Sequence, residues 1–510
     1  MVGGLIQSGG RRLALDDLRE RSLRVASGLT SVGVKDGGIV AILLRNDIPF
    51  IESLLAASSI GAYSVPINWH YKTDEVNYIL TDSQATHLVV HSDLLRGIGE
   101  GIPKSVTVLC VPTPPEVCEV YGIPPDRAAP VEGYPEWEAW MKQYPPSPER
   151  PRPPRGSMIY TSGTTGLPKG VKKEPVSSEN REAYADLRAQ WFGHRPGMRT
   201  AMIGPMYHSV QATYAIAAVR ANGSVFLLPR FDAEDVLRLV DSQKLTHLHL
   251  VPTMMNRLLH LPNAVRQKYD LSSLEFVIHG AAPCPPETKR QMIEWWGPII
   301  YEYYGTTEAG MVCRSSSEEW LLREGTVGKA WSGRTVRIYD QSGNRLPPNT
   351  EGEVYMNLGI VPNFTYHNAE HKRAEVERDG LVTNGDIGYL DEEGYLFLCD
   401  RKHDLVISGG VNIYPTEVEA VLSTHPAVLD CAVFGIPDDE FGEVPAAALQ
   451  LRDRQVLSVP DLSVFLGARL AKFKIPRRFD IRDSLPRDES GKIFKRVLRA
   501  PYWADARRRF

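Results

Sequence analysis

Residues 160–171 read YTSGTTGLPKGV, and these residue types can bind a phosphate chain. A short loop of this kind offers backbone N–H groups, hydroxyls and one lysine cation to phosphate oxygens. It is not a Walker A loop, in which the lysine is followed by Ser or Thr and opens a helix. Here Pro168 precedes Lys169, and proline disfavours a helix through the lysine. By composition alone an ordinary glycine-rich turn fits equally well, so phosphate binding has to be supported by other parts of the sequence.

A second group of reactive residue types lies at 301–308, YEYYGTTE. An aromatic ring at the end of a strand can stack on a purine, and a threonine hydroxyl can bond an α-phosphate oxygen. The carboxylate of Glu308 suits Mg²⁺, which prefers oxygen ligands. Taken alone, the run also fits a β-turn followed by a surface glutamate.

Two further positions could contact a nucleotide. Asp386 lies between Gly385 and Ile387 in a turn, where a carboxylate suits two ribose hydroxyls. Most aspartates in such turns only cap the turn. Lys492 ends the polar loop 486–492 (PRDESGK), where an isolated lysine is usually a solvated surface residue.

Together and in this order, these runs resemble the motifs of the adenylate-forming enzymes: acyl-CoA synthetases, peptide-synthetase adenylation domains and luciferases. The resemblance extends from the helix after Asp16 to Lys492, nearly the whole chain. It implies an AMP-forming acid–thiol ligase that is most like an acyl-CoA synthetase. A carboxylate attacks the α-phosphate of Mg²⁺–ATP, and the thiol of coenzyme A then takes the acyl group from acyl-AMP.

The resemblance also implies site residues. As catalytic residues it implies Lys492, Thr307, Glu308 and His208, with Glu308 and Thr161 at the metal and Asp400 as the hinge. The ATP-binding residues are Thr161, Ser162, Gly163, Thr164, Thr165, Gly166, Lys169, Gly280, Ala281, Ala282, Glu302, Tyr303, Tyr304, Gly305, Thr306, Asp386 and Arg401. The residues implied to line the acyl pocket are His208, Val210, Tyr214, His279, Gly280, Gly305 and Met311. Those implied to bind coenzyme A are Ser408, Gly409 and Gly410.

Within this scheme each residue has a role. Lys169 and the loop hydroxyls bind the β- and γ-phosphates, while Asp386 with Arg401 binds the ribose. Thr307 and Lys492 act at the reacting centre. A small mobile domain then swings about Asp400, so that the 409–410 face replaces Lys492 before the thiol attacks.

The sequence specifies the carboxylic acid substrate less closely than it specifies the reaction. Gly305 has no side chain to close the acyl pocket, which favours an apolar acid larger than acetate: aryl or phenylpropanoid, medium-to-long fatty, or steroid side chain. The alternative for Gly305 is a purely conformational need. Tyr303 counts against a flat phenylpropanoid, and no basic residue evidently awaits a second carboxylate.

The element pattern predicts an α/β fold. The first 300 residues alternate helix and strand signals, as at 39–44, 50–60 and 62–67, which indicates βαβ units with parallel sheets. Turns that bind ligands should follow the carboxyl ends of such strands. Short strands with glycine turns after about residue 330 indicate a small β-barrel-like part. We expect an N-terminal adenylate-forming domain at 1–399 and a mobile α+β domain at 400–510.

Composition excludes several classes. With 58 Lys and Arg against 62 Asp and Glu, the net charge is −4, so the sequence has no excess of positive charge for binding nucleic acid. Six scattered cysteines without a C-x-x-C pair disfavour a disulfide framework or zinc site. No signal peptide or long apolar run is evident, so we expect a cytoplasmic monomer or homodimer without a membrane span.

Other interpretations stay open. A stand-alone enzyme that loads a carrier protein shares the first step, and an oxidative luciferase-like reaction or an inactive nucleotide-binding protein is a more distant alternative. The pair His247 and His249 lies on one face of a strand, but without a third ligand we interpret it as ordinary packing.

Overall fold

The computed structural model describes most of the chain. The described residues are 3–146, 152–161, 168–331, 333–401, 404–408, 411–438, 440–453, 455, 457–487 and 492–506. The α-helices are α1 (Leu15–Ser31), α2 (Ile48–Ser59), α3 (Thr73–Asp82), α4 (Ser92–Ile98), α5 (Pro115–Tyr121), α6 (Pro125–Ala128), α7 (Trp137–Met141), α8 (Arg181–Trp191), α9 (Ser209–Arg220), α10 (Ala233–Gln243), α11 (Pro252–Leu259), α12 (Asn263–Arg266), α13 (Pro286–Trp296), α14 (Ser317–Leu322), α15 (His371–Glu375), α16 (Pro415–Ser423), α17 (Val459–Gly467) and α18 (Lys495–Ala506), with 3₁₀ turns at Gly99–Gly101 and Lys472–Lys474.

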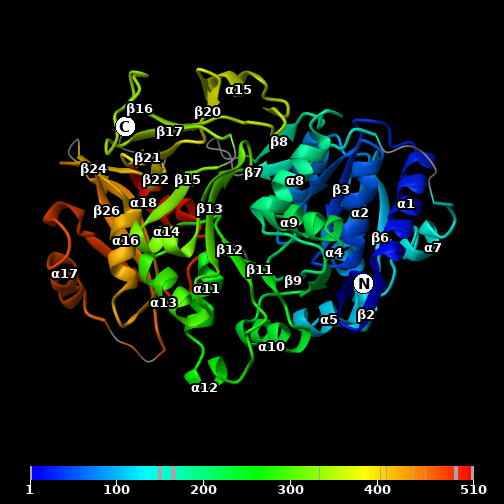
Figure 1. Cartoon of the computed structure of the whole chain (residues 1–510), viewed down its shortest axis with the longest axis horizontal. Coiled ribbons are helices and arrows are strands. Elements are labelled where there is room, and N and C mark those ends of the chain that lie inside the picture. Colours follow the sequence, from blue (N-terminus) through cyan, green and yellow to red (C-terminus); the bar gives the residue numbers. More distant parts are fainter. Residues whose placement is uncertain are drawn as a thin grey trace.

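The strands alternate with these helices over the first 300 residues and follow one another more closely afterwards (Figure 1). They are β1 (Leu5–Ser8), β2 (Arg11–Ala14), β3 (Ile39–Leu43), β4 (Tyr63–Pro66), β5 (His87–His91), β6 (Thr107–Val111), β7 (Ile159–Thr161), β8 (Lys169–Lys173), β9 (Arg199–Met202), β10 (Ser224–Leu227), β11 (His247–Leu250), β12 (Phe276–His279), β13 (Ile300–Thr306), β14 (Gly310–Ser315), β15 (Thr326–Ala330), β16 (Val336–Tyr339), β17 (Gly352–Met356), β18 (Phe364–Tyr366), β19 (Glu377–Arg378), β20 (Leu381–Val382), β21 (Asp386–Leu390), β22 (Tyr395–Arg401), β23 (Val406–Ser408), β24 (Val411–Ile413), β25 (Val428–Asp438), β26 (Gly442–Leu451) and β27 (Arg478–Ile481).

Two parallel arrays confirm the predicted βαβ units. Strands β4, β3, β5 and β6 form one sheet, and every neighbouring pair in it is parallel. Strands β10, β9, β11, β12 and β13 run parallel within a second, larger sheet. All five residues of β3 are buried, as expected of an apolar strand that is covered on both faces.

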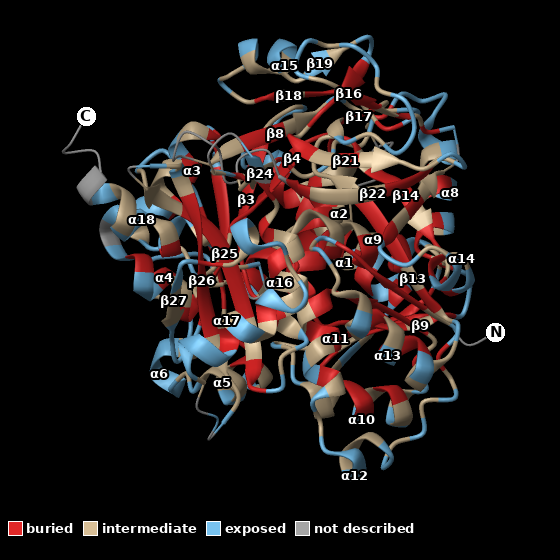
Figure 2. Cartoon of the chain, turned by 90° about the vertical axis from the view of Figure 1, so that its left-hand side faces the viewer, coloured by how far each residue is buried: buried red, intermediate tan, exposed pale blue. Residues whose placement is uncertain are grey.

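The large sheet continues beyond β13 with antiparallel strands. β14 pairs with β13, β15 with β14, and β22 with β15. The region predicted as a small barrel-like part is therefore, in the described residues, an antiparallel extension of this sheet, accompanied by the three-stranded sheet β18-β8-β7. In Figure 2 strand β14 of this extension is mostly buried, whereas β21 is largely of intermediate burial.

Two local features concern the phosphate loop and the first helix. The loop at 162–167 joins β7 to β8, which pair antiparallel, so it is a hairpin connection and does not follow a parallel strand. β8 pairs on its other side with β18, so the hairpin belongs to a separate three-stranded sheet. Helix α1 begins at Leu15, with Ala14 as its N-cap and no side-chain cap, so Asp17 lies in the first turn.

The C-terminal part has its own sheet and core. After Arg401 the chain leaves the large sheet and enters the sheet β24-β23-β26-β25, with β27 parallel to β26. Helices α16 and α17 pack on it through a separate apolar cluster that includes Val418, Leu462 and Leu466. None of the helices in the described ranges is long and apolar enough to cross a membrane.

Candidate active site

The end of β13 and the turn after it carry the YGTTE residues. A β-bulge lies between Tyr304 and Gly305, and the strand ends at Thr306. The hydroxyl of Thr306 accepts a hydrogen bond of 2.9 Å from the backbone N–H of Ala309. This turn places Thr307 and Glu308 between β13 and β14, beyond the carboxyl end of the last parallel strand.

Gly305 is a glycine because another strand lies against it. A Cβ atom at this position would lie 2.4 Å from the carbonyl oxygen of Gly310 and 2.7 Å from Cα of Met311. Both contacts are backbone atoms of β14, which cannot move aside as a flexible side chain would. The geometry supports the conformational alternative for Gly305 and weakens it as an indicator of pocket size.

We therefore expect Gly305→Ala to destabilise the protein by about 1–3 kcal/mol, because overpacking forces backbone shifts. Urea unfolding of the variant and the parent protein measures the difference. Gly97→Ala is the matched control, since a Cβ there meets nothing within 4 Å and the residue lies in helix α4. If Gly305→Ala leaves the stability unchanged and abolishes activity only on bulky acids, then Gly305 is a residue of the acyl pocket.

Tyr304 contacts Asp386, and Asp386 stands opposite Arg401 in the neighbouring strand. The hydroxyl of Tyr304 donates to Oδ2 of Asp386 at 2.7 Å, and the amide of Asn384 donates to the same oxygen at 2.9 Å. Asp386 stands opposite Arg401 in the pairing of β21 with β22, although the Arg401 side chain lies outside the described residues. A buried carboxylate held by two donors is fixed in direction, as a ribose-binding group needs to be.

Glu308 lies beside the hairpin that carries the phosphate loop. The hydroxyl of Tyr366 donates to its Oε1 at 3.3 Å, and Tyr366 pairs with Val171 of β8. In the same hairpin Thr161 stands opposite Lys169. The carboxylate and the loop therefore share one corner of the structure, although the loop residues Ser162, Gly163, Thr164, Thr165 and Gly166 lie outside the described residues.

The cations of this corner are partly buried. Burial and the neighbouring Lys372 ammonium lower the pKa of Lys169. Burial lowers the pKa of Lys173 to about 8, although the nearby Glu308 carboxylate works in the opposite direction. Cations with lowered pKa values favour an added anion, so this corner suits a phosphate chain.

The residues at this corner also fit a magnesium ion. Among the described residues, no group of three or more His, Cys, Asp or Glu side chains is placed to hold a metal ion by itself. Mg²⁺ does not need such a group, because it commonly binds through one or two carboxylates together with substrate phosphates. Glu308 supplies a single partly buried carboxylate, which fits this pattern.

Asn46 positions the loop that leads to His208, a role that no pattern around it in the sequence indicates. Its amide donates to the carbonyl oxygens of Gly204 and Leu228 at 2.9 and 3.0 Å, and its Oδ1 accepts from the N–H of Met206 at 2.9 Å. His208 follows at the N-cap position of α9, and its ring lies 4.5 Å from that of Tyr207.

The loop after β12 combines close packing with an unusual backbone. Ala281 has φ +68°, a left-handed conformation that costs a non-glycine residue about 1–2 kcal/mol. A Cβ at Gly280 would lie 2.6 Å from the carbonyl oxygen of Tyr303, so glycine is required there. Strained backbone of this kind often occurs where a ligand is bound, which agrees with the predicted nucleotide contact of 280–282.

Two predicted side chains point to the other face of the sheet. Lys289 of α13 donates to Oε2 of Glu302 at 2.6 Å, and Nε2 of His279 lies 3.7 Å from the same oxygen. Helices α9 and α13 lie on opposite sides of β11–β13 (Figure 1). His279, which the resemblance implied as an acyl-pocket residue, therefore directs its imidazole towards the side of α13, where the Glu302 carboxylate pairs with Lys289.

The α9 face holds the remaining acyl-pocket residues. Tyr214 is fully buried and its hydroxyl lies 3.1 Å from that of Thr200, while Val210 and Met311 pack in the same apolar cluster. The hydroxyl of Tyr303 lies 3.1 Å from Nε2 of His249. Sequence reasoning treated His249 as packing and did not name Gln211, whose amide contacts the same imidazole.

His194 is a buried imidazole without a hydrogen bond among the described residues. Its ring centroid lies 4.5 Å from that of Tyr214 and 5.3 Å from that of Phe192. Burial lowers the pKa of His194 to about 3, so it stays neutral at pH 7. The unfolded chain, with an ordinary histidine pKa, binds a proton more readily between these two values.

Acid should therefore destabilise the fold through His194. Stability contributed by the neutral form is complete above about pH 6.5 and falls as the pH drops towards 3. By pH 5 the loss through this residue amounts to about 2 kcal/mol. We expect His194→Phe to keep the packing and to lose less stability between pH 7 and pH 5 in urea unfolding. The exposed His260→Phe is the control, and an equal pH response of parent and His194→Phe contradicts the assignment.

The C-terminal part places Asp400 and Lys492 in different settings. Asp400 is buried, and its Oδ2 accepts from the N–H of Thr416 at 3.0 Å, which ties β22 to the start of α16. Lys492 is exposed just before α18. Ser408 ends β23 and pairs with Gly442, whereas Gly409 and Gly410 lie outside the described residues.

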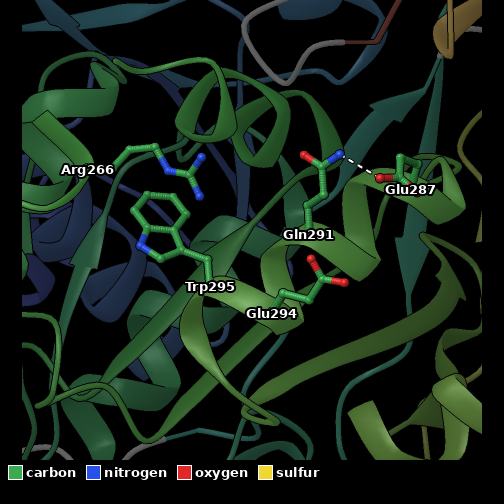
Figure 3. Close-up of a pocket in the computed structure, with 5 residues that line it drawn as sticks. All are labelled: Arg266, Glu287, Gln291, Glu294 and Trp295. Atoms are coloured by element: carbon green, nitrogen blue, oxygen red, sulfur yellow. Dashed lines mark hydrogen bonds between the residues drawn. The ribbon is translucent and has the colours of Figure 1, made fainter. Parts of the chain in front are cut away.

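A surface hollow at α12 and α13 contains none of the predicted residues. It is lined by Arg266, Glu287, Gln291, Glu294 and Trp295 (Figure 3). The guanidinium carbon of Arg266 lies 4.2 Å from the ring centroid of Trp295, and Gln291 donates to Glu287 at 2.6 Å. The hollow lies on the surface and contains none of the motif residues, so it gives no competing site.

Comparison with known families agrees with the geometry. The model of the family described as AMP-binding enzyme matches residues 4–358, and that of the AMP-binding enzyme C-terminal domain matches 417–492. The chain belongs to the AMP-binding enzyme family. It is thus a member of the adenylate-forming superfamily and, as an enzyme, falls in the acyl-CoA synthetase class of ATP-dependent, AMP-forming ligases, which confirms the resemblance seen in the sequence.

Relatives match over nearly their full length. The fatty acid–[acyl-carrier-protein] ligase ScoC of Streptomyces coeruleorubidus is 31% identical over 98% of this chain and 93% of its own. A 2-succinylbenzoate–CoA ligase of Bacillus cereus is 32% identical over 94% and 92%. The ATP-bound structure of MatB from Rhodopseudomonas palustris superimposes with a TM-score of 0.84 at 28% identity, covering 98% and 96% of the two chains.

Proposed function

We propose that this enzyme adenylates an aryl or medium-to-long aliphatic carboxylic acid, steroid side chains included, and transfers the acyl group to coenzyme A. The observation that carries the first step is the shared corner of Glu308, Lys169 and the β7–β8 hairpin. Carboxylate and phosphate are both anionic, so the main task of the site is to offset their repulsion and align the attack.

The nucleotide is held at two ends. Lys169 and the loop hydroxyls take the departing pyrophosphate, and Asp386 with Arg401 takes the ribose. Glu308 and Thr161 would hold the magnesium ion, which neutralises charge on the phosphates when it is bound. Thr307 and Lys492 bind around the reacting α-phosphate, and the backbone at Gly280–Ala282 lines the adenine and the acyl group.

The second step needs a change of position in the C-terminal part. We assign the hinge to Asp400, where β22 ends and the separate sheet follows. Rotation there would remove Lys492 and bring the face of Ser408, Gly409 and Gly410 to the acyl-AMP. The residue ranges 1–399 and 400–510 are the two units that we expect to move.

A carrier-protein thiol is the second candidate acceptor. The observation that favours it is the 31% identity to ScoC, whose name describes an acyl-carrier-protein ligase. Coenzyme A is favoured by the 32% identity to 2-succinylbenzoate–CoA ligases, whose names describe coenzyme A as acceptor. The two acceptors share the first half-reaction and differ only in the second.

Acceptor choice is tested with a panel of carboxylic acids assayed for ATP-dependent AMP formation, with and without coenzyme A. We expect several acids to give AMP, and coenzyme A to speed turnover and yield a thioester. AMP formation that is indifferent to coenzyme A, with no thioester in mass spectrometry, would assign the acceptor to a carrier protein. Phosphopantetheinylated acyl carrier protein, added in the same assay, is the positive arm for that outcome.

A further inference from the structure

A hydrogen-bonded chain of three buried side chains crosses from α9 to β13 through β11. The side-chain amide of Gln211 lies 2.9 Å from Nδ1 of His249, and Nε2 of His249 lies 3.1 Å from the hydroxyl of Tyr303. Gln211 is 3% exposed, His249 1% and Tyr303 6%. Burial lowers the pKa of His249 to about 4, so at pH 7 one ring nitrogen donates and the other accepts.

This hydrogen-bonded network leaves one polar atom at its Gln211 end without a partner among the described residues. In the described part of the chain, Oε1 of Gln211 is buried and has no hydrogen bond. If the Gln211 amide donates to His249, the imidazole donates to the Tyr303 oxygen, and the hydroxyl hydrogen of Tyr303 points elsewhere. A buried unpaired acceptor is costly, and native proteins usually satisfy it with a protein group, a water or a ligand.

If the side-chain amide of Gln211 is turned over, the donor and acceptor roles at both ends of the hydrogen-bonded network are reversed. His249 then donates to the Gln211 oxygen and accepts from Tyr303, which leaves Gln211 with free N–H donors and Tyr303 with free lone pairs. In either state one end is a donor and the other an acceptor. A substrate group that both donates and accepts, such as a hydroxyl or a primary amide, matches either state, whereas a carboxylate or an ammonium matches only one.

Both ends lie where the acyl group is expected. Gln211 is in the first turn of α9, directly after His208 and Val210. The ring of Tyr303 lies against Gly280, since a Cβ there would approach its Cε1 to 2.6 Å. Gly204 makes room for the amide, because a Cβ at Gly204 would lie 2.7 Å from Nε2 of Gln211.

We propose that Gln211, His249 and Tyr303 select an acid whose apolar body carries one neutral polar substituent, a hydroxyl or a primary amide, distal to its carboxylate. This inference rests on the proposed adenylation of an acid at this site and names the substrate class more narrowly. Gln211 contacts the substituent through its side-chain amide, and His249 and Tyr303 are the positioning residues that fix the orientation of that amide. This role in substrate selection explains why the polar side chains of Gln211, His249 and Tyr303 lie within an otherwise apolar cluster.

Matched pairs of acids test the proposal. Octanoate is compared with 8-hydroxyoctanoate, and benzoate with 3- and 4-hydroxybenzoate and with terephthalamate, the primary amide analogue, by kcat/KM for AMP release. We expect at least one polar acid to exceed its apolar partner by about tenfold to a hundredfold. Gln211→Met and Tyr303→Phe, which keep size and shape, should each reduce that ratio towards one.

The matched control is Gln291→Leu, which removes an amide from an exposed position of α13 (Figure 3) and should leave the ratio unchanged. Binding of paired acyl sulfamoyl adenosines, measured by calorimetry, gives a second readout that does not need turnover. Preference for the apolar member of every pair, or a ratio that survives both variants, overturns the proposal. Absence of AMP release from every acid instead overturns the adenylation on which it rests.

Discussion

Lys492→Ala should lower the rate of acyl-AMP formation by about a hundredfold to a thousandfold, while thioester formation from supplied acyl-AMP stays near that of the parent enzyme. The reason is that the lysine cation offsets negative charge that builds up as carboxylate and α-phosphate join, a contribution of this size when one preorganised donor is removed. The second half-reaction should not need Lys492, because rotation about Asp400 has by then moved this lysine away from the acyl-AMP. Single-turnover assays of each half-reaction measure the two rates separately.

The control for this variant is Lys472→Ala, which removes another exposed lysine of the C-terminal part. It should change neither half-reaction. Equal loss of both half-reactions in Lys492→Ala would mean that the lysine supports the fold of its loop, and that the exchange of two faces about Asp400 is wrong for this enzyme.

Glu308→Gln should lower AMP formation by about a hundredfold at moderate magnesium concentration. The amide keeps the size of the side chain and its contact with Tyr366, but it lacks the charge that holds a divalent cation. Raising the magnesium concentration should recover part of the activity, because mass action offsets weaker binding. Titration of AMP formation against Mg²⁺ at fixed ATP measures the shift.

An acidic residue outside the site provides the comparison. Glu318→Gln makes the same chemical change on the surface of α14 and should leave the magnesium titration unchanged. If Glu308→Gln forms AMP like the parent across all magnesium concentrations, then Glu308 does not hold the metal, and the corner beside the β7–β8 hairpin needs another ligand.

Much of the fold could be predicted because its signals are local. The buried run of β3 and the alternation of helices with strands up to β13 follow from apolar patterning. The hairpin at β7–β8 could not be predicted in this way, because antiparallel pairing with β18 depends on residues about 200 positions away in the sequence. A three-residue strand carries too little pattern to show which sheet it joins.

Some residues of the candidate site could likewise be predicted from the sequence, whereas others could not. Motif residues such as Asp386 and Glu308 are recognisable by type and order in the sequence. Asn46, in contrast, acts through backbone groups of the loop before His208, and nothing in its surroundings in the sequence indicates those contacts. Gln211 and His249 belong to different elements, so only the packing of α9 on β11 shows that they form one chain.

The Lys289–Glu302 pair shows why a motif does not settle side-chain direction. Glu302 lies within the YEYYGTTE run, yet alternation along β13 sends it to the face of α13, where a buried lysine meets it at 2.6 Å. Tyr303, the next residue, faces α9 instead. One-residue alternation therefore separates a structural ion pair from a residue of the acyl pocket.

Acid-dependent exchange of labelled pyrophosphate into ATP tests the central claim most directly, because only reversible formation of an acyl-AMP produces it. We predict exchange that requires both Mg²⁺ and a carboxylic acid, proceeds without any thiol, and falls to the background in Lys492→Ala. Exchange that fails with every acid of the panel, while the purified enzyme remains folded and binds ATP, would contradict the account.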